Sequence, residues 1–258
     1  MPKLNIWQWL SIVINFCVYL LFGWKFAVVM IVGLVCHELG HLIVAKKMGT
    51  KTNGFYIVLL VGAVSDIVPC RTLWKQARML LAGPIVGNIP AIIAIVLYWA
   101  TGIQWLACAA FWISAFNALN LLPMSPILDG GRIFDAITYS INKKMGLCLA
   151  AIMSLVGLAI SLVCGFPITG IVMTALGFLI LFGEYEKQRQ ESRYAHELNC
   201  EYDDVSINRP LPMTHKQMWM TALIWLVAML VLTAVCVYVW HIGLVSLRLL
   251  LRHGLTKR

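Results

Sequence analysis

Long apolar runs, separated by short polar or charged segments, follow one another along the chain. They lie near residues 6–22, 26–45, 78–100, 103–122, 146–164, 167–183 and 218–240. Because about 20 apolar residues in a helix cross the hydrocarbon core of a bilayer, the pattern predicts an α-helical polytopic membrane protein. We expect a six-span core at residues 1–183, a charged cytoplasmic linker at 184–216, and a C-terminal apolar helix or hairpin with a basic tail at 217–258.

Residues 49–76 do not fit a membrane span. Gly and Thr residues, Asn53, Asp66 and Pro69 interrupt them, and their apolar stretch at 55–64 is too short to cross. Aromatic and β-branched residues dominate this stretch, which favours a strand. We therefore expect a short re-entrant β-segment, which membrane depth permits only where protein or a water-filled cavity covers its backbone.

The composition supports a membrane protein and argues against a nucleic-acid-binding one. The chain is 61% apolar and 12% charged, whereas soluble domains are about 45–50% apolar and about 25% charged. The net charge of +9 arises from Lys and Arg residues between the apolar runs, as the positive-inside rule describes, and not on one amphipathic face. We expect a cytoplasmic N-terminus, the lipid bilayer as a partner and no nucleic acid. The basic tail fits this orientation only if residues 218–255 form a hairpin or an interfacial helix. If the last apolar run crosses the membrane instead, the tail lies on the side opposite the cytoplasm.

Acidic residues and histidines are scarce before residue 184, and three of them fall within one pentapeptide. The full set is Glu38, Asp66, Asp129, Asp135, His37 and His41. In the segment His37-Glu38-Leu39-Gly40-His41, a helix places the two imidazoles one above the other, as a pair of zinc ligands. Glu38 then has the position of the general base in H-E-x-x-H metalloproteases. Coincidence is the alternative, but an ionisable residue within a span costs about 2.5–3.5 kcal/mol on insertion scales and usually marks function.

Asp129 is the candidate for a third metal ligand. It follows the fourth span, which runs in the same direction as the second, so it ends near the same, cytoplasmic, face as His41. Pro123 and Pro126 end the helix, and Gly130 with Gly131 permits a sharp turn that returns the carboxylate toward the metal. The alternative is that Asp129 caps a helix at 130–140.

Two further acids, Asp66 and Asp135, are interpreted as capping or surface residues. The eight cysteines are scattered without C-x-x-C pairs and are interpreted as small apolar residues, not as a disulfide or zinc framework.

Two motifs in this order resemble those of the site-2 protease family, the intramembrane zinc metalloproteases. The first is the His37–His41 pentapeptide, and the second is N-L-L-P-M-S-P-I-L-D-G-G at residues 120–131. Ala82-Gly83-Pro84, with Asn88 one turn on, is similar to the family's A-G-P segment. Gly62-Ala63 lies where the family often has Gly-Gly. The resemblance covers about residues 26–140, although Asp129 follows Asn120 at a spacing one residue longer than is usual.

The resemblance implies one Zn²⁺ per chain, held by His37, His41 and Asp129, with Glu38 activating the water. It also implies that Asn120 supports the substrate or the developing oxyanion; a polar helix-packing role is the alternative for this residue. The expected activity is hydrolysis of a peptide bond within or near a transmembrane segment of a membrane protein, in regulated intramembrane proteolysis or in processing of membrane peptides.

Several points stay open at the level of sequence. The alternative functions are a non-catalytic zinc-binding membrane protein, a metal transporter, or a scaffold that has kept the fold. The re-entrant segment either holds an unwound substrate as an added strand or covers the active site as a plug. We expect a bacterial cytoplasmic membrane, with the active-site face toward the cytoplasm. The sequence does not indicate the substrate or the oligomeric state.

Overall fold

The computed structural model describes residues 6–50, 52–58, 62–67, 72–165, 167–197 and 210–255. The described chain is mostly helical, with one two-stranded sheet. It divides into two compact units: Met1–Val68, Leu81–Asn120 and Leu226–Arg258 form the first, and Pro69–Leu80 with Leu121–Trp225 forms the second. Residues 198–209 of the charged linker and 256–258 of the basic tail lie outside the described residues.

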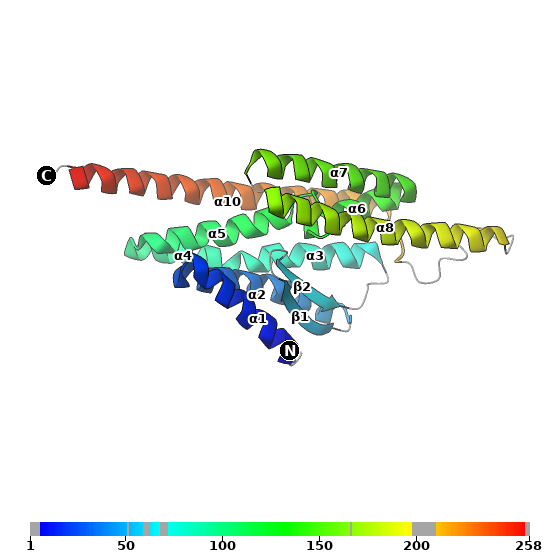
Figure 1. The fold of residues 1–258 in the computed structure, drawn as a ribbon, viewed down its shortest axis with the longest axis horizontal. Coiled ribbons are helices and arrows are strands. Elements are labelled where there is room, and N and C mark those ends of the chain that lie inside the picture. The colour runs from blue at the N-terminus through cyan, green and yellow to red at the C-terminus, as the bar shows by residue number, and fades with distance from the viewer. Residues whose placement is uncertain are drawn as a thin grey trace. The chain divides into compact units, whose positions relative to one another are not determined.

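The first unit is a bundle of apolar helices. Its elements are α1 (Ile6–Tyr19), the 3-10 turn η1 (Leu20–Phe22), α2 (Trp24–Lys47), the second half of α3 (Leu73–Gly87), α4 (Ile89–Thr101), α5 (Gln104–Asn120) and the last part of α10 (His215–Leu255). Within it, α2 packs against α1 and α5, and α4 lies beside α5 (Figure 1). Alanines fill much of the core formed by α4 and α5, because small side chains let apolar helices approach closely.

Residues 49–76 contain a β-hairpin. Its strands, β1 (Thr52–Val58) and β2 (Gly62–Ile67), pair antiparallel, with Tyr56 opposite Val64. The hairpin packs on α1 and α2 (Figure 1). The buried residues of α1 are polar, Gln8 and Asn15, seven positions apart and therefore on one face of the helix. Helix α1 therefore buries hydrogen-bonding side chains and exposes most of its apolar ones.

The second unit consists of α6 (Asp129–Ile141), α7 (Lys143–Val163), α8 (Pro167–Glu197) and the beginning of α10. Here α7 packs on both α6 and α8. The Asn142 side chain caps α7 by accepting hydrogen bonds from the backbone N–H groups of Lys144 and Met145, at 3.0 and 3.1 Å. The chain before α10 is tied to α6, since the backbone N–H of Met213 donates to Ser140 Oγ at 3.0 Å.

The loop that leads into α6 is held by a side chain of α10 and by a backbone carbonyl of α8. The indole Nε1–H of Trp225 donates to the Leu121 carbonyl at 2.9 Å, and Ser125 Oγ donates to the Met173 carbonyl at 3.3 Å. Gly130 and Gly131 lie inside the first turn of α6, so the expected sharp turn at these glycines is wrong. Their role is close approach: a Cβ at either position would collide with the carbonyl of Leu121 or of Ser125.

Among the described helices, five are long and apolar enough to cross a membrane. They are Trp24–Lys47, Leu73–Thr101 (α3 with α4), Lys144–Val163, Ile168–Gln190 and His215–Ile242. Helices of this length and composition indicate a polytopic integral membrane protein. Two of the expected spans are shorter, because α1 with η1 covers Ile6–Phe22 and α5 has 17 residues.

One helix boundary differs from the sequence-based expectation. The helix α8 continues past residue 183 to Glu197, where we expected a loop. Pairs at i and i+3 support this continuation, with Lys187 Nζ 2.8 Å from Glu184 Oε1 and Arg189 3.4 Å from Glu186. The C-terminal apolar run forms one helix, α10, and no hairpin is found between residues 215 and 255.

The buried carboxyl group of Asp135 in α6 makes the stability of the second unit depend on pH. Burial of Asp135 and the nearby Glu184 raise its pKa to about 6, against an opposing effect of Arg132. Since the folded state favours the protonated form, the stability contributed by this group falls as pH rises from about 4 to about 6. We expect Asp135→Asn to raise the Tm of the purified protein by about 4 °C at pH 7.5 and to leave it unchanged at pH 4.

The matched control for this prediction is Glu186→Gln, which removes an acid paired with Arg189 on the surface of α8. Its effect on Tm should be small at both pH values, because an exposed ion pair contributes little. A lower Tm for Asp135→Asn at pH 7.5 would contradict the prediction.

Candidate metal centre

The two histidines of the H-E-x-x-H segment face each other on α2. Both are buried, with 2% of His37 and 5% of His41 exposed. Their Nε2 atoms lie 3.1 Å apart, and the rings are nearly perpendicular. On a tetrahedral zinc ion with Zn–N distances of 2.0–2.1 Å, two nitrogens are about 3.3 Å apart. The histidine pair therefore has the separation of two nitrogen ligands of one metal ion.

Glu38 points toward the same place. It is 1% exposed, and its Oε1 atom lies 4.0 Å from His37 Nε2. At this distance the carboxylate is close to the imidazole nitrogens without forming a short hydrogen bond to His37 Nε2. The carboxylate is therefore placed to exchange a proton with a small molecule held beside the histidine pair.

The A-G-P segment of α3 packs directly against the two imidazoles. A Cβ at Gly83 would collide with the His41 ring and lie 3.0 Å from His37 Nε2. Glycine at this position therefore lets the backbone of α3 approach both rings closely.

Helix α5 contributes two amide side chains to His37. Asn117 Oδ1 lies 2.9 Å from His37 Nδ1, and Asn120 Nδ2 lies 2.9 Å from His37 Nε2. The sequence analysis identified Asn120 but missed Asn117, which is fully buried. Its position three residues before Asn120, hence on the same helix face, is the signal that could have found it.

Asp129 is the first residue of α6 and is 7% exposed. The helix N-cap is Leu128, which makes no side-chain capping bond, so the alternative that Asp129 is the N-cap is wrong. His37, His41 and Asp129 are each buried, and each has one ligand atom to offer a metal ion. Of the other acids, Asp135 lies within α6, while Asp66 is in β2 and its side chain is outside the described part of the chain.

The donor set of His37, His41 and Asp129 is suited to zinc. Two imidazole nitrogens and one carboxylate oxygen are ligands that Zn²⁺ accepts, and catalytic zinc sites have three protein ligands with one open position. Two imidazole lone pairs at 3.1 Å also repel each other unless a proton or a metal ion lies between them. The residues present therefore fit a zinc ion.

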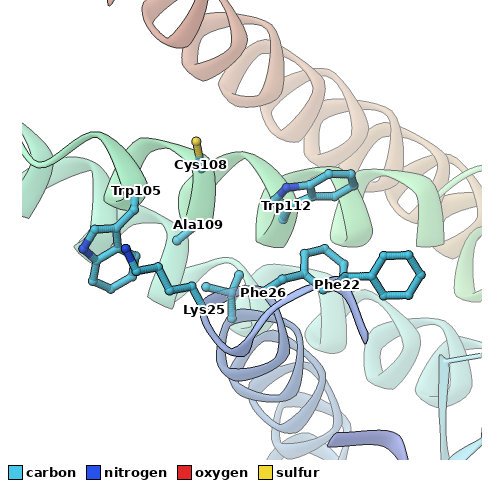
Figure 2. Close-up of a pocket in the computed structure, with 8 residues that line it drawn as sticks. Phe22, Lys25, Phe26, Trp105, Cys108, Ala109 and Trp112 are labelled. Atoms are coloured by element: carbon cyan, nitrogen blue, oxygen red, sulfur yellow. The ribbon is translucent and has the colours of Figure 1, made fainter. Parts of the chain in front are cut away.

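A cavity at the beginning of α2 is separate from these residues. It has a volume of about 550 Å³, and its lining includes Phe22, Lys25, Phe26, Trp105 and Trp112 (Figure 2). None of the residues that line it is a histidine or an acid. Because Lys25 precedes His37 by twelve residues, about 18 Å along the helix axis, this cavity is not part of the metal centre.

Comparison with known proteins gives one family model and several relatives. The model of peptidase family M50 matches residues 25–105. A zinc metalloprotease of Methanocaldococcus jannaschii is 27% identical over 197 residues, which cover 72% of this chain and 56% of that protein. The protein Rip3 of Mycobacterium tuberculosis is 28% identical over 192 residues, covering 68% of this chain and 49% of that protein. A protein of Synechocystis is 30% identical over 145 residues, covering 48% and 35%.

The chain spans about half the length of these relatives. The matched region contains both histidines, Glu38 and Gly83. Residues 25–105, which carry the buried histidine pair, are therefore similar to peptidase family M50, and the relatives share about 27–30% identity with the chain.

Proposed function

We propose that this protein is a membrane-embedded zinc metalloendopeptidase that hydrolyses a peptide bond within or near a transmembrane segment of another membrane protein. The observation that carries the proposal is the pair of buried imidazole nitrogens, 3.1 Å apart, with the Glu38 carboxylate 4.0 Å from one of them. A structural role would not require a base next to a metal-binding pair inside an apolar helix.

The proposed ligands are His37, His41 and Asp129. A bound zinc ion supplies Lewis acidity, which polarises a carbonyl oxygen and makes water more acidic. The protein positions the ligands: α2 carries both imidazoles, and Gly83 lets the backbone of α3 pack closely against the two rings.

Glu38 acts as general base and then as general acid. Its carboxylate takes a proton from the attacking water and returns it to the leaving amine. The helix holds the carboxylate beside the imidazoles, so little reorganisation is needed before proton transfer. Burial of Glu38 keeps bulk water from competing for this proton.

Asn120 supports the reacting carbonyl in this proposal. Its Nδ2 atom reaches His37 Nε2 at 2.9 Å, so the amide lies beside the position where a substrate carbonyl would be polarised. An N–H donor aimed at that oxygen stabilises the negative charge that develops on it.

The hairpin β1–β2 is the proposed contact for the substrate. A helical substrate hides its peptide bonds in internal hydrogen bonds and must unwind before cleavage. A strand edge binds an unwound segment through main-chain hydrogen bonds, with little sequence preference. The packing of the hairpin on α1 and α2 supports a re-entrant position, because backbone at membrane depth needs protein around it.

We further propose a six-span core in a bacterial cytoplasmic membrane, with the N-terminus and the active-site face toward the cytoplasm. In this arrangement α1 with η1 and the 17-residue α5 are short spans. The excess of Lys and Arg in the segments assigned to the cytoplasm supports this orientation.

Glu38→Gln tests the proposed reaction. The amide keeps the size of the carboxylate but cannot accept the proton, so cleavage should fall by about 10²–10⁴-fold. Zinc content should not change, because Glu38 is not a proposed ligand. The measurement compares the membrane proteins that accumulate with wild type and with the variant, together with zinc per chain.

Persistent cleavage by Glu38→Gln with zinc bound would rule out this mechanism. Loss of zinc from the variant would show that Glu38 contributes to zinc binding and not to proton transfer. Zinc flux into vesicles that is unaffected by the substitution would favour a metal transporter instead.

Asp129→Ala tests the third ligand. Removing the carboxylate should weaken zinc binding by at least about tenfold, because loss even of a residue that only supports a ligand costs about 10–100-fold. Zinc affinity of the purified protein is measured by competition with a chelator.

Asp135→Asn is the matched control for this substitution, since it neutralises another acid of α6 that is not a proposed ligand. It should bind zinc like the wild type. Equal zinc affinity of Asp129→Ala and the wild type would remove Asp129 from the proposed site.

A further inference from the structure

Asn117 contacts the back of the His37 ring. Its side chain is fully buried, and its Oδ1 atom lies 2.9 Å from His37 Nδ1, the nitrogen on the side of the ring away from His41. The contact joins residues 80 positions apart in the sequence. It links α5 directly to the first histidine of the H-E-x-x-H segment.

The orientation of the Asn117 amide follows from its second hydrogen bond. The Nδ2 group donates to the Ile113 carbonyl at 2.8 Å. A flipped amide would place Oδ1 against that carbonyl, with two acceptors facing each other. The oxygen therefore faces His37 and can only accept, so His37 Nδ1 carries the hydrogen.

The other nitrogen of the ring gives the same assignment. Asn120 Nδ2 is a donor and lies 2.9 Å from His37 Nε2. The N–H of Asn120 needs a lone pair on His37 Nε2 as its acceptor. In a neutral imidazole, Nε2 has this lone pair only when the hydrogen is on Nδ1. Two amides of one helix therefore select the tautomer in which Nε2 can bind a metal ion.

We propose that Asn117 is a positioning residue for zinc: it fixes the tautomer and the ring orientation of His37, and so sets zinc affinity. The proposal rests on the proposed function, because it assumes that His37 binds zinc. A metal-bound imidazole commonly donates its other N–H to an oxygen acceptor, and this second contact raises the basicity of the ligand nitrogen. Gly87 accommodates the contact, since a Cβ there would lie 2.5 Å from Asn117 Oδ1.

The same helix provides a control for a purely structural role. One turn before Asn117, Ser114 is also fully buried, and its Oγ donates to Asn88 Oδ1 at 2.9 Å. This hydrogen bond joins α5 to the residue between α3 and α4, and no hydrogen bond joins Ser114 to His37 among the described contacts. Ser114→Ala therefore removes a comparable buried bond without changing the acceptor at Nδ1.

The experiment measures zinc affinity of the purified full chain in detergent by competition with a chelator, and the Tm of the chelator-treated protein. Asn117→Leu has a similar size but no acceptor, and we expect it to bind zinc about 10–100-fold more weakly. Asn117→Asp keeps an oxygen toward Nδ1 and, when protonated, a donor toward the Ile113 carbonyl, so it should stay within about threefold of wild type. Ser114→Ala should lower the Tm and leave zinc affinity unchanged.

The outcomes separate this proposal from the proposed function. Wild-type affinity of Asn117→Leu, or equal loss in Ser114→Ala and Asn117→Leu, overturns the role of Asn117 and leaves the zinc site intact. An Asn117→Asp protein as weak as Asn117→Leu shows that the acceptor is not the operative feature, and also overturns it. A wild-type protein that binds no zinc overturns the proposed function itself.

Discussion

The need to partner every polar group of His37 inside an apolar bundle is the constraint on which the first unit depends. A buried imidazole without hydrogen-bond partners is costly, and helices in a bilayer have no water to supply them. Here α5 provides an amide at each ring nitrogen, and α2 itself provides the second histidine. The helices must therefore approach closely, which explains the small residues at their contacts, from Gly83 in α3 to the alanines of α4 and α5.

The second unit meets a different requirement, because its central feature is a loop and not a helix. Backbone groups in a non-helical segment lose their local partners, so they need other donors and acceptors. Trp225 supplies one to the Leu121 carbonyl, and Leu128 N–H donates to the Ser125 carbonyl at 3.0 Å. The first turn of α6 then packs directly on this loop, which is possible only because Gly130 and Gly131 have no side chains. The position of Asp129 is thus set by backbone contacts on both sides.

The sequence predicted the helix that carries His37, Glu38 and His41 because spacing within one helix translates directly into geometry. It did not predict Asn117, whose contact joins two helices 80 residues apart. Hydrophobic periodicity shows that a residue lies on a helix, but not which side chain of another helix it meets. The same limit explains Gly130 and Gly131, where a general property of glycine suggested a turn and the local packing required close approach.

The extension of α8 to Glu197 has another cause. Hydropathy marks the end of the apolar part of a helix, whereas the helix itself ends where its backbone bonding stops. Residues 184–190 are rich in Glu, Lys, Gln and Arg, which favour helix and form pairs at i and i+3. A membrane-spanning helix that continues in this way projects charged groups beyond its apolar part, and Glu184 thereby comes close enough to Asp135 to raise its pKa.

Burial of Glu38 links its carboxylate to the proposed metal ion by electrostatics. A charged carboxylate that is 1% exposed is costly unless a positive charge lies near it. A divalent cation at the two Nε2 atoms would supply such a charge, and Glu38 Oε1 is 4.0 Å from one of them. In the proposed site, the amides that contact His37 and the carboxylate of Glu38 therefore act on the same ion from two sides.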